Sequence, residues 1–179
     1  MTAGELVELL RAMAELPSGE ADSLSALDHG LQCAAGLAMA RPDDVELALA
    51  GLVHDVGHRF GSDEDHARLG AEEVRPALGD RIADLVGAHV MAKRYLVASE
   101  PAYRGTLSPD STRTLALQGG ALSTEEVRAF LLSPWALDAV ALRRADEAAK
   151  VPGRSVPTLG HWIPHLLRVV PTPAGGAAP

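Results

Sequence analysis

Residues 51–58 read GLVHDVGH, and this short stretch decides how the rest of the chain can be interpreted. An apolar run ends in His54 and Asp55, and His58 follows one helical turn later. Adjacent helical residues point about 100° apart, so His54 and Asp55 cannot share one narrow face. At a helix end they can still converge on a cation, because the backbone there departs from regular geometry. The alternative is an ordinary helix C-terminus, with a histidine near the dipole and an aspartate in the following loop.

The composition indicates one globular domain of closely packed helices. Of 179 residues, 47% are hydrophobic and 22% are charged, which is typical of a folded protein with a sizeable core. Aromatic residues make up only 3%, so the core must consist mostly of Ala, Leu and Val. The net charge of −8 argues against a nucleic-acid partner, although a local basic pocket can still bind a small anion.

The sequence also predicts a cytoplasmic location. The single cysteine, Cys33, excludes an intramolecular disulfide and fits a reducing compartment. Residues 1–16 lack a basic start followed by a long apolar run, so no secretory signal is predicted. No stretch is long and apolar enough to be predicted as a membrane span.

Apolar residues recur at helical spacing along the chain, which predicts a single all-α domain over residues 1–170. The predicted helices cover residues 4–16, 25–40, 43–53 with an aspartate cap at 43 or 44, 65–75, a fifth starting at 79–80, 123–132 and 133–150. Ser123 and Glu126 have the spacing of a capping box. Residues 98–110 are predicted to form a long loop, and residues 171–179 a disordered tail.

Four histidines lie on separate predicted helices, each beside apolar residues: His29, His54, His66 and His89. A neutral histidine satisfied in the core is the usual explanation for one such residue, but a poor explanation for four. Helices that project histidines and carboxylates inward build di-metal centres in all-α folds. A later carboxylate, Asp146, follows an apolar stretch and is available to such a centre, although by itself it fits a solvated face.

The order of these residues resembles the HD-domain superfamily, whose members are all-helical metal-dependent enzymes and mostly phosphohydrolases. Longer runs are more specific: DHGLQCA, GAHVMAKRYL, LSPDSTRTLALQGGALS and LRRADEAAKVPG. They resemble the branch of mixed-valence di-iron oxygenases that act on (1-hydroxy-2-aminoethyl)phosphonate and similar compounds, related distantly to myo-inositol oxygenase. The resemblance covers roughly residues 25–155 and implies a helical bundle around a dinuclear site, with two iron ions as Fe(II)/Fe(III) and O2 as co-substrate.

The resemblance also implies a role for each matching residue. His29, His54, Asp55 and Asp146 would bind one iron, whereas Asp55, His66 and His89 would bind the other, with Asp55 as the bridge. The phosphonate would be held by His58, Lys93, Ser111 and Arg143, with Gln118 orienting this shell. Helical spacing agrees, since Lys93 lies one turn after His89 and Arg143 three residues before Asp146. Without the resemblance, Lys93 fits a solvated helix end as well as it fits a binding site. Arg143 likewise fits a surface salt bridge equally well.

One stretch departs from the family pattern. The relatives carry a tyrosine and a glutamate in the loop before the first histidine ligand, where the glutamate contacts the amine of the substrate. Here that stretch reads PSGEADSLSALDH and contains no tyrosine. Asp22 is the best positional match for the glutamate, although a helix cap or a solvated loop explains it as well. We therefore expect a substrate that does not depend on an amine.

The resemblance implies oxidative cleavage of the carbon–phosphorus bond of a small 1-hydroxyphosphonate, with release of inorganic phosphate. An HD-type phosphohydrolase acting on a small phosphate ester or nucleotide is the alternative, because the same cations would bind either anion. A third possibility is a binding module that holds a metal only as a structural staple.

Overall fold

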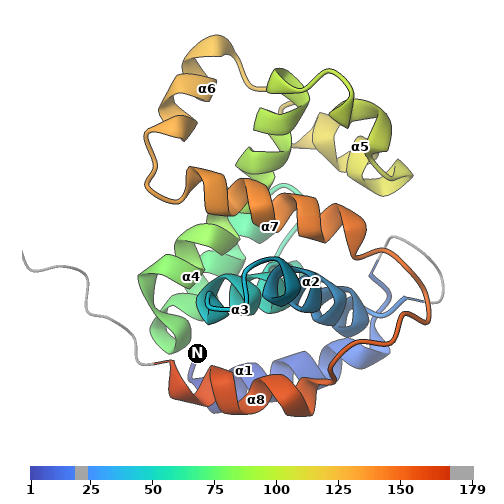
Figure 1. The fold of residues 1–179 in the computed structure, drawn as a ribbon, viewed down its shortest axis with the longest axis vertical. Helices are drawn as coiled ribbons and strands as arrows, with labels where there is room; N and C mark the ends of the chain where they lie inside the picture. The colour runs from blue at the N-terminus through green and yellow to red at the C-terminus, as the bar shows by residue number, and fades with distance from the viewer. Residues whose placement is uncertain (19–23, 170–179) are drawn as a thin grey trace, which may run out of the picture.

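The computed structural model describes residues 1–18 and 24–169, and over these ranges the chain is almost entirely helical (Figure 1). The prediction of an all-α fold is confirmed. In the described ranges the only β feature is an isolated bridge between Pro17 and Ser25. The elements in order are α1 Ala3–Ala12, η1 Met13–Glu15, α2 Ala26–Ala40, α3 Val45–Val53, η2 Val56–Arg59, α4 His66–Ser99, η3 Tyr103–Thr106, α5 Pro109–Leu117, α6 Thr124–Leu131, α7 Ala136–Ala148 and α8 Leu159–Arg168.

The middle of the molecule is formed by α2, α3, α4 and α7, which contact one another. Helix α3 is apolar on every side beyond its first turn, and Leu47, Leu49 and Leu52 are completely or almost completely buried. A helix of this kind must be surrounded by protein, so it lies at the centre of the bundle. Helices α1 and α8 pair on one side of this centre, while α5 and α6 lie on the opposite side of α7 (Figure 1).

Helix α4 is folded back on itself at Gly79. On a straight helix His66 and His89 would be separated by about 34 Å, from a rise of about 1.5 Å per residue. Their Nε2 atoms are instead 2.9 Å apart. Gly79 has φ 82° and ψ 178°, a conformation open essentially to glycine alone, and Pro76 lies just before it. The predicted break at 79–80 is therefore confirmed, and it turns two helical arms into a hairpin.

A close approach of two backbones joins the start of α4 to η2. A Cβ atom on Gly57 would lie 1.8 Å from the carbonyl oxygen of His66, so only glycine fits at this point. This contact draws the end of α3, with His54 and Asp55, against the first arm of α4.

Several predicted helix ends are confirmed by their caps. The Asp44 side chain accepts a hydrogen bond from the Leu47 N–H at 3.1 Å, and Ser123 and Glu126 form a complete capping box. The helix predicted from residue 133 begins three residues later, at Ala136.

The predicted loop over residues 98–110 is confirmed for residues 100–108, and its ends are helical. Helix α4 continues to Ser99, a 3-10 turn follows, and α5 begins at Pro109 behind its Ser108 cap. Proline at the first helical position starts a helix rather than breaking one.

Helix α8 was not predicted from the sequence, where Pro164 interrupts the helical pattern. The predicted disordered tail and Asp22 lie outside the described residues. Along the described chain, every helix is too short or too polar to cross a membrane.

We predict that Gly79→Ala lowers the free energy of unfolding by about 1–3 kcal/mol, because alanine is strained at this φ and ψ. Urea denaturation of the metal-free protein measures the change. The matched control is Gly36→Ala on the exposed side of α2, where a Cβ meets nothing within 4 Å. That substitution should raise stability by roughly 0.5–1 kcal/mol. Equal effects of the two substitutions would contradict the role of Gly79.

Candidate metal centre and anion pocket

Six predicted ligands come together at the centre of the bundle. The histidines are all buried, as is Asp146, and only the side chain of Asp55 has appreciable exposure, at 24%. They come from α2 (His29), the end of α3 (His54), the turn after it (Asp55), the two arms of α4 (His66 and His89) and α7 (Asp146). The fold therefore gathers onto one point residues that are spread over more than a hundred positions of sequence.

Each of the four buried histidines donates its Nδ1–H to a backbone carbonyl. The acceptors are Ala149 at 3.0 Å for His29, Gly51 at 2.8 Å for His54, Asp63 at 2.7 Å for His66 and Val86 at 2.6 Å for His89. A carbonyl can only accept, so the hydrogen of a neutral ring is assigned to Nδ1. Every Nε2 atom then faces the centre, the arrangement found at histidine-ligated metals.

The facing nitrogens of His66 and His89 favour a cation between them. Their Nε2 atoms face each other at 2.9 Å, and both Nδ1 hydrogens are already used. Burial lowers the pKa of His66, and burial together with the neighbouring His66 ring holds the pKa of His89 well below its usual range. Both rings are therefore neutral, and two lone pairs oppose each other.

The carboxylate of Asp55 lies between two halves of the cluster. Its Oδ2 is 3.5 Å from Nε2 of His29 and 3.3 Å from Nε2 of His54. Its Oδ1 is 3.6 Å from Nε2 of His66 and 3.8 Å from Nε2 of His89. Two donors at about 2.0–2.2 Å from one ion lie about 3–3.5 Å apart, so each half has nearly the dimensions of a metal site. One oxygen of Asp55 faces each half.

The first half also contains Asp146, whose Oδ1 is 3.2 Å from Nε2 of His29 and 3.6 Å from Nε2 of His54. Nε2 of His54 is buried and has no hydrogen-bond partner in the described part of the chain. Burial disfavours a charged His54, but the carboxylates of Asp55 and Asp146 outweigh burial and raise its pKa well above the usual value. The same carboxylates would favour a metal cation in that position.

The donor set of imidazole nitrogens and carboxylate oxygens therefore fits a metal centre with two positions. In the described part of the chain, two groups of side chains have ligand atoms close enough to share an ion, namely His29 with His54 and Asp55, and Asp55 with His58 and His66. His58 is half exposed, and its ring stacks on His66 with centroids 4.1 Å apart. The structure thus places His58, predicted as a phosphonate ligand, at the edge of the second position, where it could bind either metal or substrate.

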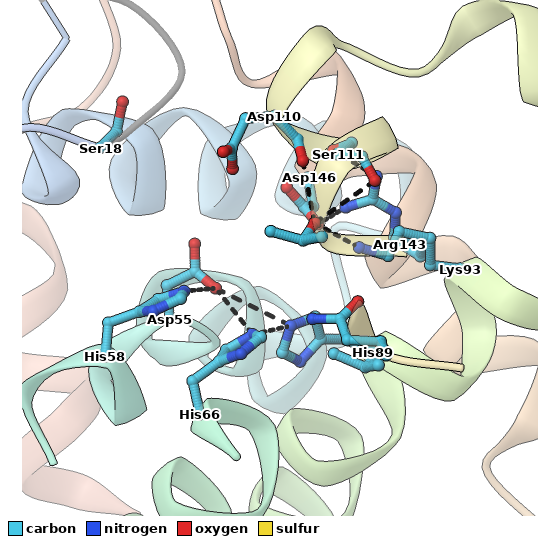
Figure 2. Close-up of a pocket in the computed structure, with 13 residues that line it drawn as sticks. Ser18, Asp55, His58, His66, His89, Lys93, Asp110, Ser111, Arg143 and Asp146 are labelled. Atoms are coloured by element: carbon cyan, nitrogen blue, oxygen red, sulfur yellow. Dashed lines mark hydrogen bonds and ion pairs between the residues drawn. The ribbon is translucent and has the colours of Figure 1, made fainter. Parts of the chain in front are cut away.

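A small polar cavity adjoins the cluster (Figure 2). Its free volume is about 40 Å³, and in Figure 2 the histidines and Asp55 lie across it from Arg143, Ser111 and Lys93. We call this space the inner cavity. Lys93, Ser111 and Arg143 are all buried, which rules out the alternatives of a solvated helix end and a surface salt bridge. Buried cations beside a candidate metal centre can bind a small anion.

Lys93 and Arg143 differ in how many of their N–H groups already donate to an acceptor in the protein. Lys93 donates from Nζ to the Thr114 hydroxyl at 2.9 Å, and burial together with nearby Arg143 lowers its pKa to about 8. Arg143 donates to Tyr103, Ser111, Asp146 and Glu147, so most of its N–H groups already have acceptors.

Gln118 also lines the inner cavity. Its Nε2 donates to the Asp63 carbonyl at 2.9 Å, which fixes the orientation of the amide. Its Oε1 is buried and accepts no hydrogen bond from any residue in the described ranges. This oxygen is available to a hydrogen-bond donor of a ligand.

Sequence reasoning missed several residues around the anion pocket. Thr114 and Asp110 line the inner cavity, and Tyr103, Glu147 and Lys150 support it from outside. The i, i+4 spacing of Arg143 and Glu147 was a visible signal for an ion pair. Tyr103 lies in residues 98–110, which the sequence predicts to form a loop.

The HD domain family model matches residues 20–127, more than half of the chain. The chain therefore belongs to the HD-domain family. Two relatives indicate to which branch of the HD-domain family the chain is similar. A hydroxymethylphosphonate dioxygenase of Gimesia maris is 36% identical over 152 residues, covering 79% of this chain and 75% of the relative. A glycine-betaine-forming [1-hydroxy-2-(trimethylamino)ethyl]phosphonate dioxygenase of Leisingera caerulea is 33% identical over 180 residues, covering 93% and 91%. The predicted phosphonate oxygenase branch is confirmed.

We predict that Asp55→Ala loses iron from both positions, because a single carboxylate faces both halves. Elemental analysis of iron-reconstituted protein measures the loss. The control is Asp65→Ala, which removes an exposed carboxylate next to His66 that pairs with Arg68 at the surface. Iron retained in full by the Asp55 variant would show that this carboxylate does not bridge.

Proposed function

We propose that this protein is a di-iron, O2-dependent oxygenase that cleaves the carbon–phosphorus bond of a small 1-hydroxyphosphonate. The observation that carries the proposal is the position of Asp55 between two histidine-rich halves, with buried cations across the same small cavity. A centre with four imidazoles suits iron better than Mg²⁺, which prefers oxygen donors. The names of both relatives support the phosphonate class.

In this proposal His29, His54 and Asp146 hold one iron, His66 and His89 hold the other, and Asp55 bridges them. When bound, the two irons would supply the redox chemistry with O2. Both atoms of O2 end in the products, because the hydroxylated carbon becomes a carboxylic acid and phosphorus leaves as inorganic phosphate. The protein positions the substrate, neutralises its charge and limits the water around it.

Lys93 is the principal cation for the phosphonate. Its ammonium is buried at the inner cavity, and among the residues that the structure describes its hydrogen-bond acceptor is the neutral hydroxyl of Thr114 rather than a carboxylate. Arg143 and His58 lie on either side of the same space and complete the anion site. The free oxygen of Gln118 is suited to accept the hydrogen of the substrate hydroxyl.

The substituent on the hydroxylated carbon would extend into a second cavity. This outer cavity shares Ser18, Asp55, His58 and Asp110 with the inner one and has a free volume of about 380 Å³. Part of its wall is apolar and consists of Met13, Leu16, Pro17 and Ala26.

Two carboxylates in the wall of the outer cavity, Asp63 and Asp110, both pair with Arg113 at 2.8 and 2.7 Å. Among the described lining residues, these two are therefore poorly placed to demand an ammonium group. The names of the relatives span substrates with no substituent and with a trimethylammonium group. We expect turnover here with no more than about a tenfold preference for a 2-amino group, or about 1.4 kcal/mol. A larger preference that is lost in Asp22→Ala would show that Asp22 reaches the ammonium.

An HD-type phosphohydrolase is the alternative, and one experiment separates the two. Iron-reconstituted protein is incubated with small 1-hydroxyphosphonates, with and without air, and inorganic phosphate is measured. We expect phosphate only in air, together with a mixed-valence electron paramagnetic resonance signal before substrate is consumed. Phosphate release from esters by Mn²⁺-loaded protein without O2 would support the hydrolase. A metal-bound protein inert in both assays would support the binding module.

We predict that Lys93→Met weakens phosphonate binding by about 1.5–3 kcal/mol, the range for a hydrogen bond to a charged group, without loss of iron. The wild type should lose affinity as pH rises through about 8, where Lys93 of the free protein gives up its proton. The variant should lack this step. Calorimetric titration with methylphosphonate measures both effects. Arg94→Met is the control, since Arg94 bonds Gly120 and Glu126 instead. An unchanged dissociation constant would exclude Lys93 from the site.

A further inference from the structure

The carboxylate of Glu147 accepts hydrogen bonds from four donors around the anion pocket. Its Oε1 accepts from the Ser108 N–H at 2.7 Å. Its Oε2 accepts from the Ser111 hydroxyl at 3.0 Å, from Lys150 Nζ at 3.2 Å and from the Arg143 guanidinium. These donors come from the start of α5 and from the end of α7 and the residues after it. Glu147 therefore links the two elements that carry the candidate phosphonate ligands.

Glu147 acts from behind the pocket. Arg143 and Ser111 line the inner cavity, whereas Glu147 lines a separate cavity on the outside, beside Tyr103 and Arg144. Its side chain is only 11% exposed. A carboxylate in this position does not compete with a phosphonate for the inner space, because the guanidinium and the hydroxyl lie between them.

The guanidinium of Arg143 is held in four directions. Nε donates to the Tyr103 hydroxyl at 3.0 Å, Nη1 to Asp146, and Nη2 to Ser111 at 3.0 Å and to Glu147. Without the charge of Glu147, the outer side of Nη2 would lose its anionic acceptor. The contact with Asp146 would remain, so the metal ligand would keep its support.

The hydroxyl of Ser111 has one hydrogen, and a carboxylate partner can only accept it. In the ligand-free protein this hydrogen therefore lies toward Glu147, while the oxygen accepts from Arg143 and Lys150, the latter at 2.8 Å. A phosphonate in the inner cavity can take this hydrogen by rotation of the hydroxyl, since Glu147 keeps its other three donors.

We propose that Glu147 is a positioning residue for substrate: from the outer side it fixes Arg143 and Ser111 in the geometry that binds the phosphonate, with Lys150 as its counter-ion. This inference rests on the proposed function, because it assumes that the inner cavity binds a phosphonate. Lys150 lies within the same group of contacts and balances the charge that Glu147 brings.

The test compares Glu147→Gln, Glu147→Asp and wild type, all iron-reconstituted. Binding of methylphosphonate is measured by calorimetry, and kcat and KM are measured with hydroxymethylphosphonate. We expect the dissociation constant and KM of Glu147→Gln to rise about tenfold, which is about 1.4 kcal/mol. Iron content should not change, and kcat should change less than KM. Glu147→Asp, which keeps the charge, should recover part of the affinity.

The matched control is Glu100→Gln. Glu100 lines the same outside cavity but pairs with Arg144 at 2.5 Å, so its variant should bind methylphosphonate like wild type. A dissociation constant for Glu147→Gln within about twofold of wild type would overturn the inference. Such a change is far smaller than the loss of one charge-assisted hydrogen bond would cause. A parallel loss of iron and affinity would also overturn the inference, because it would mean that Glu147 supports the metal ligand Asp146 rather than the anion site. A wild-type protein that binds no methylphosphonate and releases no phosphate would instead overturn the proposed function.

Discussion

The structure depends on one repeated interaction, the hydrogen bond from a buried histidine Nδ1–H to a backbone carbonyl. Four such bonds fix four tautomers, and each leaves an Nε2 atom facing the same small volume. The carbonyl that holds His29 belongs to Ala149, at the end of α7, only three residues after Asp146. The packing of α7 against α2 therefore orients the candidate ligand His29 and also places the candidate ligand Asp146 beside it.

This arrangement has an energetic cost in the absence of metal. The opposed nitrogens of His66 and His89 are groups of like character held close together by the two arms of α4. A cation between them relieves this repulsion. Metal binding to the folded state alone is also stabilising by mass action, so stability and metal occupancy are coupled in this protein.

The sequence was most informative where a local rule and a chemical requirement coincide. Helix caps at Asp44 and Ser123 could be read directly, and histidines beside apolar residues indicated a buried cluster. The sequence also showed a break at Gly79, but not that the chain folds back there, because the direction of a turn depends on φ and ψ. Glu147 was invisible as a support for the pocket. Its spacing from Arg143 predicts an ion pair, whereas the side of the cavity on which it lies is set by tertiary packing.

The inner and outer cavities share Ser18, Asp55, His58 and Asp110, but the rest of their walls comes from different parts of the chain. Beyond these shared residues the inner cavity is lined from α4, α5 with its C-cap Gln118, and α7. Backbone carbonyls orient His66, His89 and Gln118, and the Glu147 carboxylate holds Ser111 and Arg143. The apolar wall of the outer cavity comes from η1, the residues that follow it and the first residue of α2. Those wall residues are not among the candidate metal ligands, so their side chains can change size without disturbing the tautomers or the bridge. Under the proposed function, the metal centre can therefore stay the same while changes in the outer wall admit different substituents, as expected when function is set by a site rather than by the fold.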